Sequence, residues 1–114
     1  MRIRAKIRDA SEGSVVVTMF GRFDLRATIA DVAQRFRYAE GTQVTEDAQN
    51  RLYELALQRG AAADINSGNV TQHDAELAIT AVLLAARTLG PISVTHINEF
   101  AERFCNQETH LWWC

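Results

Sequence analysis

The side chains best suited to chemistry lie near the end of the chain, where two cysteines and a histidine fall within ten residues. They are Cys105, His110 and Cys114. Thiolate and imidazole groups are the usual ligands of zinc, and His73 or His96 could complete a tetrahedral set if the chain folded back on itself. Zinc ligands come most often in closely spaced pairs, however, and this set lacks such a pair. We therefore predict no metal site and no cofactor.

Covalent catalysis would need a nucleophile with a base beside it, and Cys114 with His110 is the one local combination. Cys105 continues the apolar spacing of the last predicted helix, which indicates a small buried side chain. The sequence also lacks a glycine-rich phosphate loop, a Gly-x-Ser-x-Gly elbow, a His-Glu-x-x-His pair and a Cys-x-x-Cys pair. We therefore predict no catalytic residues and no enzymatic activity.

Binding residues are easier to propose than catalytic ones, and the first set is basic. Arg2, Arg4, Lys6 and Arg8 alternate with Ile3, Ala5 and Ile7, so four cations would project from one face of a strand. Such a row could follow the phosphates of a nucleic acid, and a transcriptional regulator is our alternative function. The simpler interpretation is that charges on an edge strand prevent unwanted pairing.

The second set of binding candidates is aromatic. Leu111, Trp112 and Trp113 stand in the last four residues, and they include both tryptophans of the chain. Tryptophan is enriched among the side chains that anchor protein interfaces, so these three residues are predicted to contact a partner. The alternative is that both rings fold back and fill a groove between helices.

Composition and charge limit the classes of function that remain. The chain has 114 residues, 47% of them hydrophobic and 23% charged, as expected for one globular domain. Residues 1–26 carry six basic and three acidic side chains, whereas the whole chain has a net charge of −2. The longest apolar stretch is far shorter than the ~20 residues that span a bilayer, and the start lacks a secretory pattern. We predict a small acidic cytoplasmic protein that contacts no membrane.

Residue spacing predicts a β-hairpin followed by helices. Residues 2–8 and 15–20 have strand character, with turn residues 11–14 between them. A first helix follows from about residue 25, capped by Asp24 or Thr28 and ended by Gly41. A second begins after Thr45 and is expected to pass through Gly60 to about residue 66.

A third helix is capped by Thr71 with Asp74 and is predicted to run to about Leu89. Its polar positions form only a narrow stripe, so we expect it to be the central helix of the core, covered on most sides. A fourth helix begins at Ser93 or Thr95, after Gly90 and Pro91.

These elements predict an α+β fold, in which an N-terminal β-hairpin packs on a small four-helix bundle. The chain is interpreted as one domain, residues 1–114, that comprises a hairpin (1–23), a helical bundle (24–105) and a C-terminal tail (106–114). A homodimer is a further alternative, formed by pairing hairpins or exchanging tails.

The predicted function is that of a non-enzymatic protein-binding module. Compact acidic chains that favour Arg over Lys and lack catalytic motifs are common in phages and mobile elements, where they often block a larger host machine. This association favours a small inhibitor or adaptor of a bacterial protein or nucleoprotein complex, similar in kind to an anti-CRISPR protein. Acidic helical faces could then cover a nucleic-acid-binding surface on the target.

Overall fold

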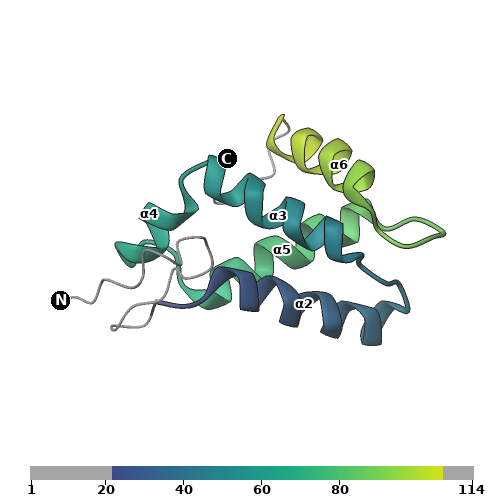
Figure 1. Cartoon of the computed structure of the whole chain (residues 1–114), viewed down its shortest axis with the longest axis horizontal. Helices are drawn as coiled ribbons and strands as arrows, with labels where there is room; N and C mark the ends of the chain where they lie inside the picture. The colour runs from purple at the N-terminus through teal and green to yellow at the C-terminus, as the bar shows by residue number, and fades with distance from the viewer. Residues whose placement is uncertain (1–21, 107–114) are drawn as a thin grey trace.

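The computed structural model describes residues 22–106, which form five helices (Figure 1). They are α2 (Leu25–Glu40), α3 (Glu46–Gln58), α4 (Ala61–Asn66), α5 (Gln72–Ala86) and α6 (Val94–Asn106).

The α+β class predicted from the sequence is wrong, because residues 22–106 are mostly helical and contain no strand or sheet. The hairpin behind that prediction has no counterpart in this region, and its expected strands, 2–8 and 15–20, lie outside the described residues. A period-two pattern is a local signal, and two strands are marginal unless a third strand or a helix supports them. The single β-type contact in the described part is an isolated parallel bridge between Val44 and Ile92.

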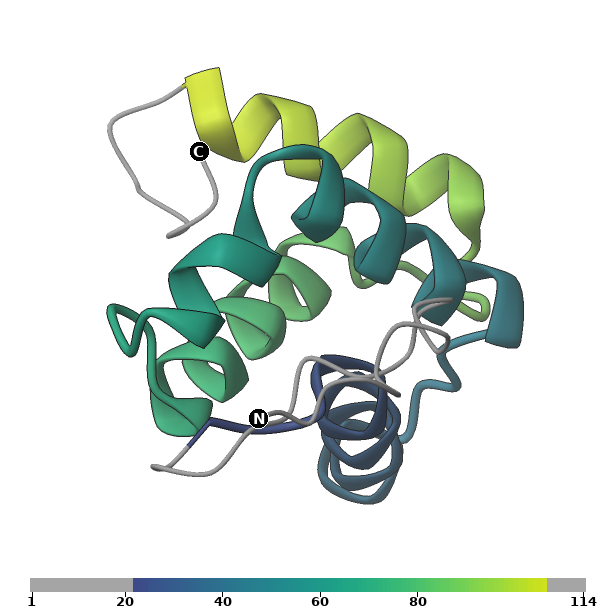
Figure 2. The same ribbon diagram turned by 60° about the vertical axis from the view of Figure 1, so that its left-hand side comes forward.

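Two helical hairpins, α2–α3 and α5–α6, lie side by side with their connecting loops at the same end (Figure 1). The amide of Ile92 donates to the carbonyl of Gln43 at 2.8 Å, and the amide of Thr45 donates to the carbonyl of Ile92 at 3.0 Å. These bonds join the two loops through the parallel bridge. Helix α5 packs on α2 and α6, and α3 packs on the same two helices, so the four form a closed bundle (Figure 2).

The helix ends follow the predicted capping chemistry. Asp24 caps α2 by accepting from the amide of Ala27 at 3.0 Å, and Gly41 ends it in the left-handed region at φ 72°. Thr45 caps α3 through the amide of Ala48 at 3.1 Å. Thr28, the other predicted cap, lies inside α2 instead, and its hydroxyl donates to the carbonyl of Asp24 at 2.8 Å.

The predicted second helix is divided in two, which raises the helix count from four to five. Gly60 has φ 91°, a left-handed conformation that side chains disfavour, and it separates α3 from the short α4. A glycine in this conformation is a common way to end a helix. The prediction that the helix passes through Gly60 is therefore wrong.

Helix α5 ends three residues earlier than predicted. Arg87 is extended, with φ −67° and ψ 133°, so residues 87–93 form the loop to α6. Pro91 disfavours helical geometry at the residue before it, and Ile92 enters the bridge with Val44. Helix α6 then begins at Val94. This start directly follows Ser93, one of the two residues predicted to begin the helix.

The core lies between the four long helices and is built from the predicted apolar stripes. Most of it is aliphatic, with three buried aromatic rings: Phe36 on α2, Tyr53 on α3, and Phe23, two residues before α2 begins. The largest completely buried side chains are Leu25, Ile29, Leu52, Ile65, Ile79, Val82, Leu83, Ile92 and Ile97. Helix α5 contributes three of them and contacts both neighbouring helices, which confirms its predicted place in the core.

Candidate functional site

The residues predicted to bind a partner all lie outside the described part of the chain. They are Arg2, Arg4, Lys6, Arg8, Leu111, Trp112 and Trp113. The basic face and the aromatic anchor therefore stay predictions, and a candidate site has to be sought among residues 22–106.

The outward faces of three long helices are largely polar. Exposed positions include Arg26, Asp31, Gln34 and Arg37 on α2, Glu46, Asp47, Glu54 and Gln58 on α3, and Thr95, Asn98, Glu99 and Arg103 on α6. Among the described side chains of these helices, Tyr38, near the end of α2, is the large apolar exception, with 88% of its surface exposed.

Helix α5 differs, because leucines occupy its outward face. Leu77 is 57% exposed and Leu84 is 45% exposed, and half-buried Ala81 lies between them. The spacing i, i+4 and i+7 places all three on one face of the helix. We call Leu77, Ala81 and Leu84 the α5 ridge. Most of α5 is covered, as predicted, but this face remains open to solvent.

A shallow groove lies along the side of the α5 ridge that faces α2. Its volume is about 230 Å³, and its apolar lining includes Val32, Phe36, Ala39 and Leu84. An apolar groove next to exposed leucines can receive an apolar side chain, and burial stabilises association by roughly 25 cal/mol per Å² of apolar surface removed from water.

Two ion pairs between α2 and α5 frame this groove. Arg35 contacts Glu76 at 3.4 Å near one end, and Arg87 pairs with Glu40 at the other. Arg35 also contacts Asp31 at 2.9 Å within α2. Half-exposed pairs of this kind contribute little to stability, ~0.2–1 kcal/mol each. A polar rim around an apolar centre is the usual anatomy of a protein interface.

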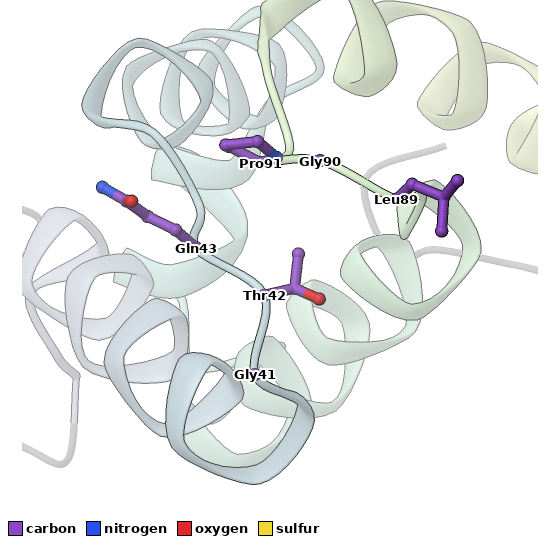
Figure 3. Close-up of a pocket in the computed structure, with 6 residues that line it drawn as sticks. All are labelled: Gly41, Thr42, Gln43, Leu89, Gly90 and Pro91. Atoms are coloured by element: carbon purple, nitrogen blue, oxygen red, sulfur yellow. The ribbon is translucent and has the colours of Figure 1, made fainter.

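A second hollow, of about 200 Å³, lies at the loop end of the bundle (Figure 3). It is lined by Gly41, Thr42, Gln43, Leu89, Gly90 and Pro91. These six residues bring backbone, one hydroxyl and one amide to the hollow, and none of them is ionisable. Leu89 is fully exposed and points away from the segment of Gly41 and Thr42. The hollow therefore offers no ionisable side chain that could act as a general acid or base.

The described histidines have local partners. The Nδ1 atom of His96 accepts from the amide of Ser93 at 3.1 Å, so this ring helps to cap α6. His73 lies 3.7 Å from Glu76, one turn along α5. Among the side chains that the structure describes, which exclude Glu102 and Cys105, no three His, Cys, Asp or Glu residues are close enough to share a metal ion. His110 and Cys114 lie outside this part, so their combination with Cys105 is not tested.

The pKa of Asp74 is shifted clearly from its ordinary value. Its carboxylate accepts from the amide of Thr71 at 3.0 Å, and its own amide donates to the hydroxyl of Thr71 at 3.1 Å. The bond from the Thr71 backbone, followed by that from the Thr71 side chain, lowers the pKa of Asp74 below its ordinary value of 3.8. The predicted capping box at the start of α5 is confirmed, and it accounts for this shift without any catalytic role.

The charge of the described part is acidic. Residues 22–106 include eight arginines and eleven aspartates and glutamates. A surface that follows a nucleic acid normally has an excess of basic groups on one face. The nucleic-acid alternative therefore depends on the basic residues at positions 2–8, which the structure does not describe.

The α5 ridge is the feature that sequence analysis missed, although a signal for it was present. Ala75, Ile79, Val82, Leu83 and Ala86 form the buried stripe of α5, and the ridge is a second apolar stripe on the opposite side. A helix that is apolar all round indicates complete burial when it is considered alone. Only the positions of α2 and α6 reveal which stripe is left open.

In the described residues, no helix is long and apolar enough to cross a membrane. Comparisons with protein-family models, with curated proteins and with solved structures found no match for this chain.

Proposed function

We propose that this chain is a protein-binding module without chemistry of its own, and that the α5 ridge is its docking surface. The observation that supports the proposal is the contrast between α5 and the other long helices. Leu77 and Leu84 keep about half of their surface in water, although the same helix buries its other stripe completely. Neighbouring apolar residues exposed within a polar surface commonly mark a site of protein association.

The groove and its ion pairs add to this proposal. A partner's apolar side chain placed beside Leu84 would contact the wall formed by Val32 and Ala39. The pairs Arg35–Glu76 and Glu40–Arg87 would then surround that contact and limit access of water. Interface energy is concentrated in such apolar centres, whereas the surrounding polar contacts contribute less.

The role predicted from the sequence belongs to this proposal. An inhibitor or adaptor needs a compact body with a surface that attaches to a larger machine, and it needs no catalytic group. Occupation of the α5 ridge by a partner would leave the acidic side chains Glu46, Asp47 and Glu54 of α3 exposed, where they could repel or occlude a competing nucleic acid.

The test is affinity capture by three tagged forms of the purified protein from a nuclease-treated bacterial lysate, to which the untagged, unchanged chain has been added. They are the unchanged chain, a double variant Leu77→Ser and Leu84→Ser, and the matched control Leu89→Ser. The control also removes an exposed leucine, but from the loop between α5 and α6 rather than from the ridge. We expect a stoichiometric protein, whether a second copy or another chain, that is retained by the control and lost from the double variant.

Two results would contradict the proposal. One is recovery of nucleic acid alone, lost steeply as salt rises, which would favour the basic residues 2–8 and the regulator alternative. The other is a protein partner that binds the double variant as well as the unchanged chain, which would exclude the α5 ridge as the docking surface. Circular dichroism of all three forms shows whether the helices remain folded.

A further inference from the structure

We propose that the partner of the α5 ridge is a second copy of this chain, paired with antiparallel α5 helices about a twofold axis. This inference rests on the proposed function, because it identifies the occupant of the same surface. An isologous interface requires a surface that is complementary to itself, and the arrangement of side chains along α5 meets that requirement.

The apolar residues of the ridge have the required register. An axis that crosses α5 between Thr80 and Ala81 places Leu77 of one copy level with Leu84 of the other. The two small, half-buried residues, Thr80 and Ala81, meet at the axis, where the helices come closest. Leucine packs against leucine on both sides of a centre that permits close approach.

The charges along α5 favour the antiparallel direction. Asp74 and Glu76 lie in the first turns of the helix, and Arg87 directly follows its last turn. Antiparallel pairing places Arg87 of each copy level with Asp74 of the other copy. Glu76 of that other copy then lies about 3 Å from the same level, measured along the helix axis. Parallel pairing would instead bring the acidic ends together.

The edge of the ridge beside α2 carries both Glu76 and Arg87, as their ion pairs with Arg35 and Glu40 show. A twofold axis in the plane of the interface keeps this edge on the same side in both copies. Glu76 and Arg87 of the two copies can therefore approach each other along it. A guanidinium has five donors, so Arg87 can retain Glu40 while it contacts a second carboxylate.

The first measurement is sedimentation equilibrium of the full chain over a concentration series. We expect a reversible dimer, and we expect Leu84→Glu to raise its dissociation constant by at least about tenfold, because it places a carboxylate in the apolar centre. Leu77→Glu is the second variant, in case the first fails to fold, and Leu89→Glu is the matched control that should dimerise like the unchanged chain.

The direction of pairing is tested by introduced cysteines. Ala81→Cys lies next to the axis, so its two copies should form a disulfide with each other. Leu77→Cys should not link to itself, because its two copies lie about 10 Å apart along antiparallel helices, beyond disulfide reach. Mass spectrometry of the linked peptides separates these bonds from any formed by Cys105 or Cys114.

Three results would overturn the dimer proposal. They are a chain that remains monomeric at the highest concentration, a dimer that Leu84→Glu and Leu77→Glu leave unchanged, and self-linking of Leu77→Cys in place of Ala81→Cys. A monomer that captures a different protein through the α5 ridge would disprove the dimer but support the proposed function. A monomer that captures no protein would contradict both.

Discussion

Helices α5 and α6 occupy similar positions but present different surfaces to solvent. Each packs on two neighbours, and each begins at a local cap, the Thr71–Asp74 box for α5 and the Ser93–His96 contact for α6. The outward side of α6 carries Thr95, Asn98, Glu99 and Arg103, whereas that of α5 carries Leu77 and Leu84. Since α6 needs no exposed leucine to hold its place, the packing of the bundle does not explain the α5 ridge.

This comparison separates two uses of apolar surface in one helix. The inward stripe of α5 lies in the core, where burial stabilises the fold. The outward stripe gains little on folding, because water still reaches about half of each leucine. A free-energy gain from that stripe requires another molecule to cover it.

The largest effect that we expect is on the free energy of unfolding, which should depend on the inward stripe of α5 and hardly on the outward one. We expect Ile79→Ala, in the completely buried stripe, to lower it by about 2–5 kcal/mol. Leu77→Ala, on the outward stripe, should change it by less than about 1 kcal/mol, because most of the side chain is already in water. Urea unfolding followed by circular dichroism measures both.

The protein has to be dilute in this experiment, so that self-association does not add to the stability of the unchanged chain. An equal loss from both substitutions would show that Leu77 belongs to the core and that the two faces of α5 do not differ.

A smaller effect is expected from the capping box at the start of α5, which should contribute to the stability of the helix but not to association through the α5 ridge. Thr71→Ala removes the hydroxyl of the capping box and should lower the free energy of unfolding by about 1 kcal/mol. Because Thr71 precedes the ridge by more than one turn, the dimer dissociation constant should stay within about twofold of its original value. Unfolding and sedimentation measurements on the same preparation give both quantities. A large loss of association in Thr71→Ala would show that the α5 ridge depends on the capping box for its position.

Much of the helical part of the fold could be predicted from the sequence, because local chemistry determines it. The caps Asp24, Thr45 and Thr71, and the stop at Gly41, use side-chain or glycine geometry that is legible in a few residues. Gly60 was misinterpreted, since a glycine can lie inside a helix or break it, and the packing of α4 decides which. The α+β class failed because a period-two pattern does not show whether a sheet is present to receive it.

The candidate site was less accessible to sequence analysis than the fold. Whether Leu77 is buried depends on where α2 and α6 lie, and neither position can be derived from the spacing within α5. The predicted binding residues rest on side-chain type, on alternation within residues 2–8 and on position in residues 111–113, and none of these shows which surface of the folded chain is exposed. The α5 ridge could be recognised only when the neighbouring helices were in place.

The smallest effect that we expect concerns pH and again tests the start of α5. The pKa of Asp74 is lower in the folded chain than its ordinary value of 3.8, because Thr71 donates hydrogen bonds to its carboxylate. Its stabilising contribution is therefore complete above that ordinary value and is lost as pH falls through the lower folded pKa.

Between about pH 5 and pH 2, Asp74→Asn should show a smaller fall in the free energy of unfolding than the unchanged chain. Thr71→Ala should lie between them, because it keeps the backbone bond and loses the hydroxyl. Identical pH profiles for all three would mean that the box does not hold the first turn of α5, and therefore that the ridge is positioned by packing on α2 and α6 alone.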